Sequence, residues 1–229
     1  EKEIRSLFYS MSSHLRPSLM TIAADYGMPG FAMRSAGLLK RDGHPVNLKA
    51  LYPFPSWQLP NEVEIDAAFI YAMVRQESQF YSRAMSGRGA RGLMQLMPRT
   101  AASIGKSKRF RRGKGRDALF DPKTNLILGS KYLLHLMQSG NLSGNLFKVL
   151  AAYNAGPGNL RKWERKLEYK NDPLLFIESI PSRETRHFIK KVMLGLWIYR
   201  FRLNELAPTL SDVAGGNWPK YMPASKNKL

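Results

Sequence analysis

One glutamate stands alone at a position where a carboxyl group could do acid–base chemistry. Glu77 ends an apolar run that begins near Ile65, and the next acidic residue is Asp117. Eleven Lys or Arg and no Asp or Glu lie between them. Burial disfavours the charged form of a carboxyl group, and the negative end of a helix dipole acts in the same direction. Glu77 is therefore a candidate proton donor, and an exposed helix-end residue without a role is the competing interpretation.

A second carboxylate is missing from the neighbourhood of Glu77 in the sequence. Most glycosidases use two carboxylates that flank the scissile bond. No acid follows Glu77 for 39 residues, so a partner would have to come through the fold from Asp117, Asp121, Glu178 or Glu184. One carboxylate is also sufficient if groups of the substrate take over the role of the second carboxylate. A nucleophile on the substrate itself has a large effective concentration at the reacting carbon.

The composition is strongly basic and lacks cysteine. The net charge of +19 attracts nucleic acid, anionic lipid or an acidic polymer, with a solvated basic surface as the alternative. Seven Lys or Arg residues lie within residues 106–116. This segment is interpreted as a flap over the site, as a segment that binds an anionic polymer, or as a solvated loop. No nucleic-acid reading motif is recognisable, so nucleic acid is not expected as a partner. No metal or other cofactor is expected, because cysteine is absent and metal-ligand spacing is lacking among His14, His44, His135 and His187.

The elements that must position Glu77 are predicted to be helices, since helical spacing of apolar residues is common and strand-like alternation is scarce. Residues 62–77 are expected to form a buried helix, opened by Asn61 with Glu64 as a capping box. Proline and capping residues predict the starts of further helices at Pro98, Pro122, Pro157, Pro173 and Ser182, and residues 145–155 are expected to form another helix that ends at Gly156.

The chain is predicted to have three parts. Residues 51–60 are rich in proline and aromatic residues and are expected to be an extended connector. We therefore divide the chain into a helical segment with linker (1–60), a larger helical domain that contains Glu77 (61–205) and a basic, turn-rich tail (206–229), interpreted as a loose arm. The first segment is interpreted as the end of a helical array, or alternatively as part of one body with the rest.

Four stretches combine glycine, proline and polar residues in a fixed order: RQESQFYSRAMSGRGARGLMQLMPRTA, LFDPKTNLILGSKYL, AAYNAGPG and ESIPSRETRHFIKKV. They are similar to the four successive motifs of soluble lytic transglycosylases of the glycoside hydrolase family 23 type. The resemblance covers residues 61–205 without gaps inside the motifs, and extends more weakly upstream. It implies a mainly α, lysozyme-like catalytic domain. The run 105–117 is more basic than the family pattern requires.

The resemblance also implies roles for individual residues. Glu77 matches the single catalytic acid and base, and Ser86 matches a serine that contacts substrate near the scissile sugar. Tyr153 matches a tyrosine near the catalytic acid, where it either hydrogen-bonds Glu77 or is a core tyrosine whose hydroxyl is satisfied elsewhere. Further implied substrate contacts are Gln95, Met97, Asn154 and Glu184, with Glu178 as a second candidate glutamate. The aromatic residues that either line sugar subsites or pack in the core are Trp163, Tyr169 and Phe176.

The activity implied is cleavage of the MurNAc–GlcNAc β-1,4 bond of peptidoglycan without water, which gives 1,6-anhydromuramic ends. Two alternatives stay open: a hydrolase of the same fold, and a non-catalytic protein that binds polyanions. The substrate implies a periplasmic location. The residues begin with EKEIRSLF and show no signal peptide, so we expect a mature or trimmed product. The sequence indicates no membrane-spanning segment and no particular protein partner.

Overall fold

The protein is mainly helical, as predicted. A computed structural model describes residues 2–224, in which β-structure is limited to isolated bridges. No helix in this range is long and apolar enough to cross a membrane. The helices are α1 Lys2–Ser10, η1 Ser13–Leu15, α2 Arg16–Asp25, α3 Pro29–Arg41, α4 Leu48–Leu51, α5 Ala67–Ser78, α6 Pro98–Ile104, η2 Lys108–Arg111, α7 Gly113–Asp117, η3 Ala118–Phe120, α8 Pro122–Gln138, α9 Leu146–Ala155, α10 Pro157–Glu164, α11 Pro173–Ser179, α12 Arg183–Arg202 and α13 Pro208–Ala214.

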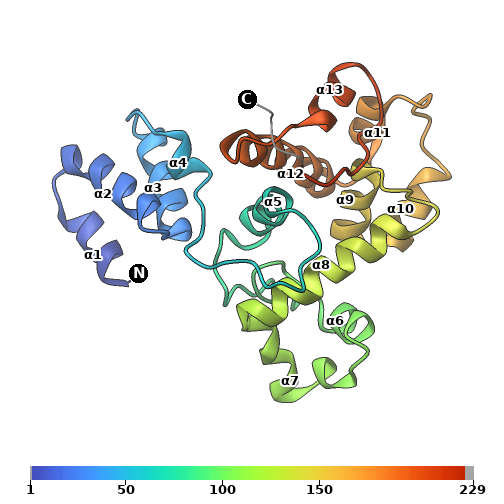
Figure 1. The fold of residues 1–229 in the computed structure, drawn as a ribbon, viewed down its shortest axis with the longest axis horizontal. Coiled ribbons are helices and arrows are strands. Elements are labelled where there is room, and N and C mark those ends of the chain that lie inside the picture. Colours follow the sequence, from blue (N-terminus) through green and yellow to red (C-terminus); the bar gives the residue numbers. More distant parts are fainter. Residues whose placement is uncertain (1, 225–229) are drawn as a thin grey trace.

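Helix α5 is the centre of the main core, and it packs more extensively against α12 than against any other helix (Figure 1). Phe69, Ile70 and Met73 of α5 are completely buried. The two helices approach closely because α12 carries a glycine at the contact. A Cβ atom added at Gly195 would lie 3.2 Å from the Cβ atom of Ala72. The long apolar run thus becomes a helix that is enclosed on nearly all sides.

The start of α5 differs from the prediction. The capping box at Asn61 and Glu64 does not form, and the helix begins at Ala67 with Asp66 as its N-cap. One carboxylate oxygen of Asp66 accepts a hydrogen bond of 3.1 Å from the backbone nitrogen of Phe69. Asp66 is also held by residues far away in the sequence, and those contacts favour it over Asn61 as the cap.

The segment after α12 is not a loose arm. The backbone nitrogen of Leu146 donates to the Pro219 carbonyl at 2.8 Å, and that of Tyr221 donates to the Gly144 carbonyl at 2.9 Å. These bonds fix the described residues of the tail against the start of α9. The last five residues of the predicted tail, 225–229, lie outside the described range.

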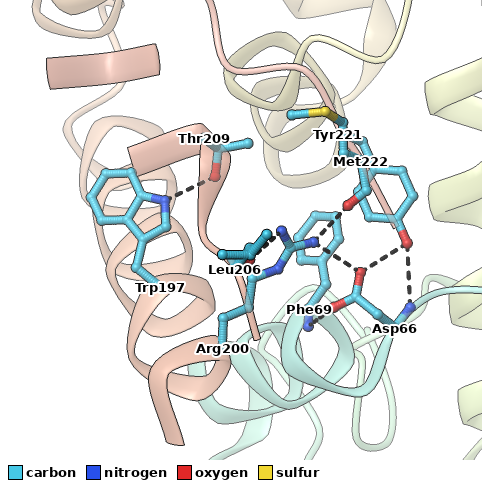
Figure 2. Close-up of polar contacts among 8 residues, drawn as sticks. All are labelled: Asp66, Phe69, Trp197, Arg200, Leu206, Thr209, Tyr221 and Met222. Atoms are coloured by element: carbon cyan, nitrogen blue, oxygen red, sulfur yellow. Dashed lines mark hydrogen bonds and ion pairs between the residues drawn. The ribbon is translucent and has the colours of Figure 1, made fainter. Parts of the chain in front are cut away.

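A polar cluster joins this segment to the start of α5 (Figure 2). The Tyr221 hydroxyl donates to a carboxylate oxygen of Asp66 at 2.9 Å and accepts from the Asp66 backbone nitrogen at 3.3 Å. Arg200 of α12 pairs with the same carboxylate oxygen at 3.3 Å and donates to the Met222 carbonyl at 2.6 Å. Arg200 and Asp66 are almost fully buried, so each charge depends on the other.

The N-terminal helices have a core of their own. Apolar side chains of α1–α4, such as Phe8, Phe31 and Leu39, form a cluster distinct from the one around α5. Figure 1 shows these helices beside the rest of the chain, joined to it by the extended connector. They touch the end of α5, because a Cβ atom added at Gly30 would lie 3.0 Å from the Gln79 carbonyl oxygen. The domain division near residue 60 stays a prediction.

Candidate active site

Glu77 lies in the last turn of α5 and is partly exposed. Its carboxyl group is nevertheless surrounded largely by protein. Burial, and secondarily the negative charge of Glu184, raise the pKa of Glu77 from 4.5 to about 8. Helix α5 ends abruptly after it, because Gln79 and Phe80 both adopt positive φ angles, of 51° and 63°. The side chain therefore stands at a sharp turn of the chain and is protonated at neutral pH.

The four possible carboxylate partners are separated by the fold. Asp117 lies 3.9 Å from the Nε atom of Arg91, and Asp121 caps α8 by accepting from the Thr124 backbone nitrogen. Glu178 pairs with Lys190 and is exposed. Glu184, exposed in the first turn of α12, is the one whose charge acts on Glu77.

Ser86 lies in a tight turn of the loop that follows α5. The backbone nitrogen of Ser86 donates to the Ala90 carbonyl at 3.0 Å, and the Ser86 Oγ atom accepts from the Ala90 backbone nitrogen at 3.0 Å. The turn needs Gly89, whose φ angle is +86°. Because Oγ acts as an acceptor within the turn, its proton is available to donate to a ligand.

Gln95 holds the same loop from inside. Its Nε2 atom donates to the carbonyl oxygens of Ala84 at 3.0 Å and Gly92 at 2.9 Å, which uses both amide protons. Its backbone has a φ angle of 45°. Gln95 thus shapes the loop, and only its amide oxygen is left to accept from a substrate. Met97 follows at the N-cap of α6 with its side chain 40% exposed.

The sequence reasoning missed Asn125, which fixes this loop to α8. Asn125 is completely buried, accepts from the Met94 backbone nitrogen at 2.7 Å, and donates to the carbonyls of Arg91 at 2.8 Å and Leu119 at 2.7 Å. Gly92 leaves the room for it, because an added Cβ atom would lie 2.3 Å from the Asn125 Nδ2 atom. The available signal for a buried polar residue was the single Asn directly before the apolar run LILG.

The Tyr153 hydroxyl is satisfied within the protein, which fits the second of its two interpretations. Its hydroxyl donates to the Met94 carbonyl at 2.8 Å. Tyr153 is nonetheless close to the acid. Burial, and next the Glu77 charge, raise the pKa of Tyr153 well above its usual value. The tyrosine therefore stays neutral, and its oxygen is left with acceptor capacity toward a protonated Glu77.

Asn154 connects α9 to the first turn of α12. The Oδ1 atom of Asn154 lies 2.7 Å from the Thr185 hydroxyl, and the backbone nitrogen of buried Thr185 donates to Ser182, the N-cap of α12, at 3.2 Å. The contact holds the first turn of α12, and with it Glu184, against the end of α9. The amide protons of Asn154 are left for other partners.

The three aromatic candidates belong mainly to the core. Phe176 is completely buried, and the rings of Tyr169 and Phe176 meet edge to face at 5.1 Å between centroids. Trp163 is half-buried and packs against the main cluster. This packing favours the interpretation of all three as core residues. Among the described residues, no three His, Asp or Glu lie close enough together to hold a metal ion.

Known proteins are similar to this chain in sequence and in fold. Residues 58–176 match the family model described as the transglycosylase SLT domain. A soluble lytic murein transglycosylase of Salmonella typhimurium is 36% identical over 149 residues, which make up 65% of this chain and 23% of the relative. The 70 kDa soluble lytic transglycosylase of Escherichia coli matches with a TM-score of 0.74 at 30% identity, over 88% of this chain and 32% of that one. An inactive glutamate-to-glutamine mutant of the lytic transglycosylase Slt from Pseudomonas aeruginosa matches with a TM-score of 0.70 at 28% identity, over 96% of this chain and 35% of that one.

The match is extensive for this chain and partial for its relatives. The chain spans 23% of the length of the Salmonella relative, so it corresponds to one part of that protein. The family model covers more than half of the 229 residues. The structural matches confirm the expected helical, lysozyme-like fold. This chain belongs to the transglycosylase SLT domain family.

Proposed function

We propose that the chain is a peptidoglycan lytic transglycosylase that cleaves the MurNAc–GlcNAc β-1,4 bond and leaves a 1,6-anhydromuramic end. The observation that carries the proposal is the raised pKa of Glu77, about 8, on an otherwise ordinary carboxyl group. General acid catalysis at neutral pH needs a group that is protonated there and still able to release its proton. The relatives are named lytic murein transglycosylases, and the Pseudomonas structure is of an inactive glutamate-to-glutamine mutant.

In the first step, Glu77 donates its proton to the glycosidic oxygen and becomes a carboxylate. The bond between that oxygen and C1 of the MurNAc residue breaks, so GlcNAc leaves with a free 4-hydroxyl group. Positive charge develops on C1, and the N-acetyl oxygen of the same sugar stabilises it. The new Glu77 carboxylate also stabilises this charge, because it lies in a largely desolvated environment.

In the second step, Glu77 acts as a base. Its carboxylate takes the proton of the C6 hydroxyl of the MurNAc residue, and the C6 oxygen closes on C1. Glu77 is thereby returned to its protonated form, and no water is consumed. A raised pKa helps here as well, since it makes the carboxylate a stronger base.

The surrounding residues support both steps. Glu184 helps to keep Glu77 protonated before the substrate arrives. Ser86 has a hydroxyl proton to donate to the sugar near the scissile bond, and Met97 offers an exposed apolar surface beside the same loop. Gln95 and Tyr153 act chiefly by holding the loop and Met94 in place. Asn154 and Glu184 present polar groups from the facing helices α9 and α12.

One digest separates the candidate activities. Purified peptidoglycan is treated with the protein, and the released muropeptides are analysed by mass spectrometry. Anhydro ends are lighter by one water than hydrolysed ends, so a lysozyme-type hydrolase gives a different mass. Glu77→Gln is expected to lower the rate by at least about a hundredfold while it retains binding to the polymer. Hydrolysed ends, or full activity of Glu77→Gln, would contradict the proposal.

We assign this activity to residues 61–205, with 1–60 and 206–229 as flanking segments. The substrate supports a periplasmic location, because peptidoglycan lies outside the cytoplasmic membrane. A fragment of residues 61–224 keeps the contacts between Tyr221 and Asp66 and tests the division. Activity of this fragment equal to that of the whole chain would support it.

A further inference from the structure

The seven cations of residues 106–116 form part of a small structural unit, which we call the basic lobe. The basic lobe comprises residues 98–117, with helices α6, η2 and α7. It lies at the edge of the molecule, below α8 in Figure 1. All seven cationic residues are exposed: Lys106, Lys108, Arg109, Arg111, Arg112, Lys114 and Arg116. Asp117, the one acid of the lobe, points toward Arg91.

The basic lobe is packed and therefore differs from a solvated loop. Phe110 is 4% exposed and shares a local core with Leu96, Ala101 and Leu128. The chain also folds tightly on itself, because a Cβ atom added at Gly115 would lie 2.0 Å from the Arg109 carbonyl oxygen. This packing holds the cations on a defined surface.

One cation of the lobe also has a contact within it, because the Arg109 guanidinium lies over the Phe110 ring, 4.8 Å from its centroid, but ion pairs do not hold the charges of the lobe. Within the described residues, the ion pairs with Asp or Glu include none of the seven cations. Like charges close together on one surface repel each other and destabilise a compact state. Their concentration on one lobe is better explained by an anionic ligand.

The basic lobe continues into the loop that carries the proposed substrate residues. Helix α6 begins directly after Met97, with the exposed Arg99 in its first turn, and Arg88 adds an exposed cation in the turn that carries Ser86. The guanidinium group of Arg91 lies over the Phe120 ring, 5.7 Å from its centroid, while its Nε atom faces Asp117. Exposed cations therefore lie on both sides of Met97 in the chain, in the lobe and in the turn that carries Ser86, and the largely buried Arg91 links the two segments through Asp117.

We infer that the basic lobe binds carboxylates on the peptide stems of the same glycan strand that Glu77 cleaves, so the inference rests on the proposed function. Carboxylates in series along a polymer complement a row of exposed cations. Two other anions fit less well. Membrane-surface binding usually adds exposed apolar anchors, and single-stranded nucleic acid stacks its bases on aromatic rings. Phe110, the aromatic residue of the lobe, is buried.

The test measures binding in a Glu77→Gln background, so that the polymer is not cut during the assay. The lobe variant carries Lys108→Gln, Arg111→Gln, Arg112→Gln and Lys114→Gln. A matched control removes the same charge from another exposed site, α10 and the turn after it, through Arg161→Gln, Lys162→Gln, Arg165→Gln and Lys166→Gln. Each protein is sedimented with insoluble peptidoglycan, with the same material after amidation of its carboxylates, and with phosphatidylglycerol vesicles.

We expect the lobe variant to bind native peptidoglycan about tenfold more weakly than the control at low salt, and the difference to shrink above about 0.5 M salt. On amidated peptidoglycan, the two should bind equally. A charge-conserving pair, Arg111→Lys and Arg112→Lys, should bind like the parent. Thermal midpoints of unfolding confirm that each variant is folded.

Three results would overturn the inference. The first is equal binding of the lobe variant and the control to native peptidoglycan. The second is that the lobe variant binds amidated peptidoglycan more weakly than the control by the same factor as native peptidoglycan, and the third is that it binds only the anionic vesicles more weakly. Failure of the proposed function is seen separately. If the Glu77→Gln protein releases muropeptides during sedimentation, Glu77 is not the acid, whatever the lobe binds.

Discussion

The raised pKa of Glu77 makes the stability of the protein depend on pH, and Glu77→Gln should remove that dependence. The folded protein holds the Glu77 proton up to about pH 8, whereas an ordinary carboxyl group releases it near 4.5. Because the folded-state pKa is the higher one, the stabilising contribution is complete below pH 4.5 and is lost as the pH rises through about 8. Above about pH 8, the folded protein carries a Glu77 carboxylate that is poorly solvated.

The size of this effect follows from the two pKa values. At about 1.36 kcal/mol per pKa unit, the interval from 4.5 to about 8 corresponds to about 5 kcal/mol for full ionisation. Glu77 is partly exposed, and water that reaches the carboxylate lowers the cost, so we expect about 2–3 kcal/mol to be observed. The glutamine has no proton to lose. Glu77→Gln should therefore be more stable than the parent by about 2–3 kcal/mol above pH 8, with little difference near pH 5.

Urea unfolding at pH 5 and pH 8.5, followed by the fluorescence of the four tryptophans, measures this difference. Glu168→Gln removes one carboxyl group from an exposed position and corrects for the change in net charge. If the difference in unfolding free energy between Glu77→Gln and the parent is the same at both pH values, the carboxyl group is not desolvated. The assignment of Glu77 as a neutral proton donor would then lose its basis.

Three further predictions concern the residues around Glu77. Glu184→Gln should lower the pKa of Glu77 and move the alkaline limb of the pH–activity profile to lower pH, because one negative neighbour is gone. Gly92→Ala should destabilise the fold by at least about 2 kcal/mol, since the new methyl group would lie 2.1 Å from the Leu119 carbonyl oxygen at a φ angle of 79°. Tyr221→Phe should cost about 1–2 kcal/mol of unfolding free energy through its lost hydrogen bonds to Asp66.

Each of these changes has a matched control in the chain. Glu178→Gln removes a charge that pairs with Lys190 and should leave the alkaline limb where it is. Gly87→Ala adds a methyl group with no atom within 4 Å and should be nearly neutral. Tyr26→Phe changes a tyrosine that is 75% exposed. Equal effects of a variant and its control would contradict the corresponding prediction.

The helices were predictable from local signals. Asp121 and Ser182 each cap a helix through the side chain at the predicted start, and Pro157 and Pro173 begin helices as expected. The helix expected over 145–155 forms as well, with Asn145 as its N-cap. These signals act within four residues, so the sequence displays them directly. The mainly helical class and the buried nature of α5 follow from the same local periodicity.

The remaining features depend on residues that are distant in the sequence. The start of α5 was placed too early, because Asp66 is selected by Arg200 and Tyr221 across the fold. The hydrogen-bond partner of Tyr153 could not be chosen from the sequence for a similar reason, as its hydroxyl donates to the carbonyl of Met94, 59 positions away. The importance of Asn125 becomes visible only when three carbonyl and amide groups converge on it. Local patterns carry no information on such pairings.

The contact between Asp66 and Tyr221 also has a consequence for biosynthesis. The two residues are 155 positions apart, so a ribosome adds Tyr221 long after it has released the segment that becomes α5. Until then the first turn of that helix lacks the tyrosine and the carbonyl of Met222 that accompany Arg200 in the finished protein. A nascent chain therefore cannot complete the support of the helix that bears Glu77 until residues 221 and 222 have been added and have reached that helix.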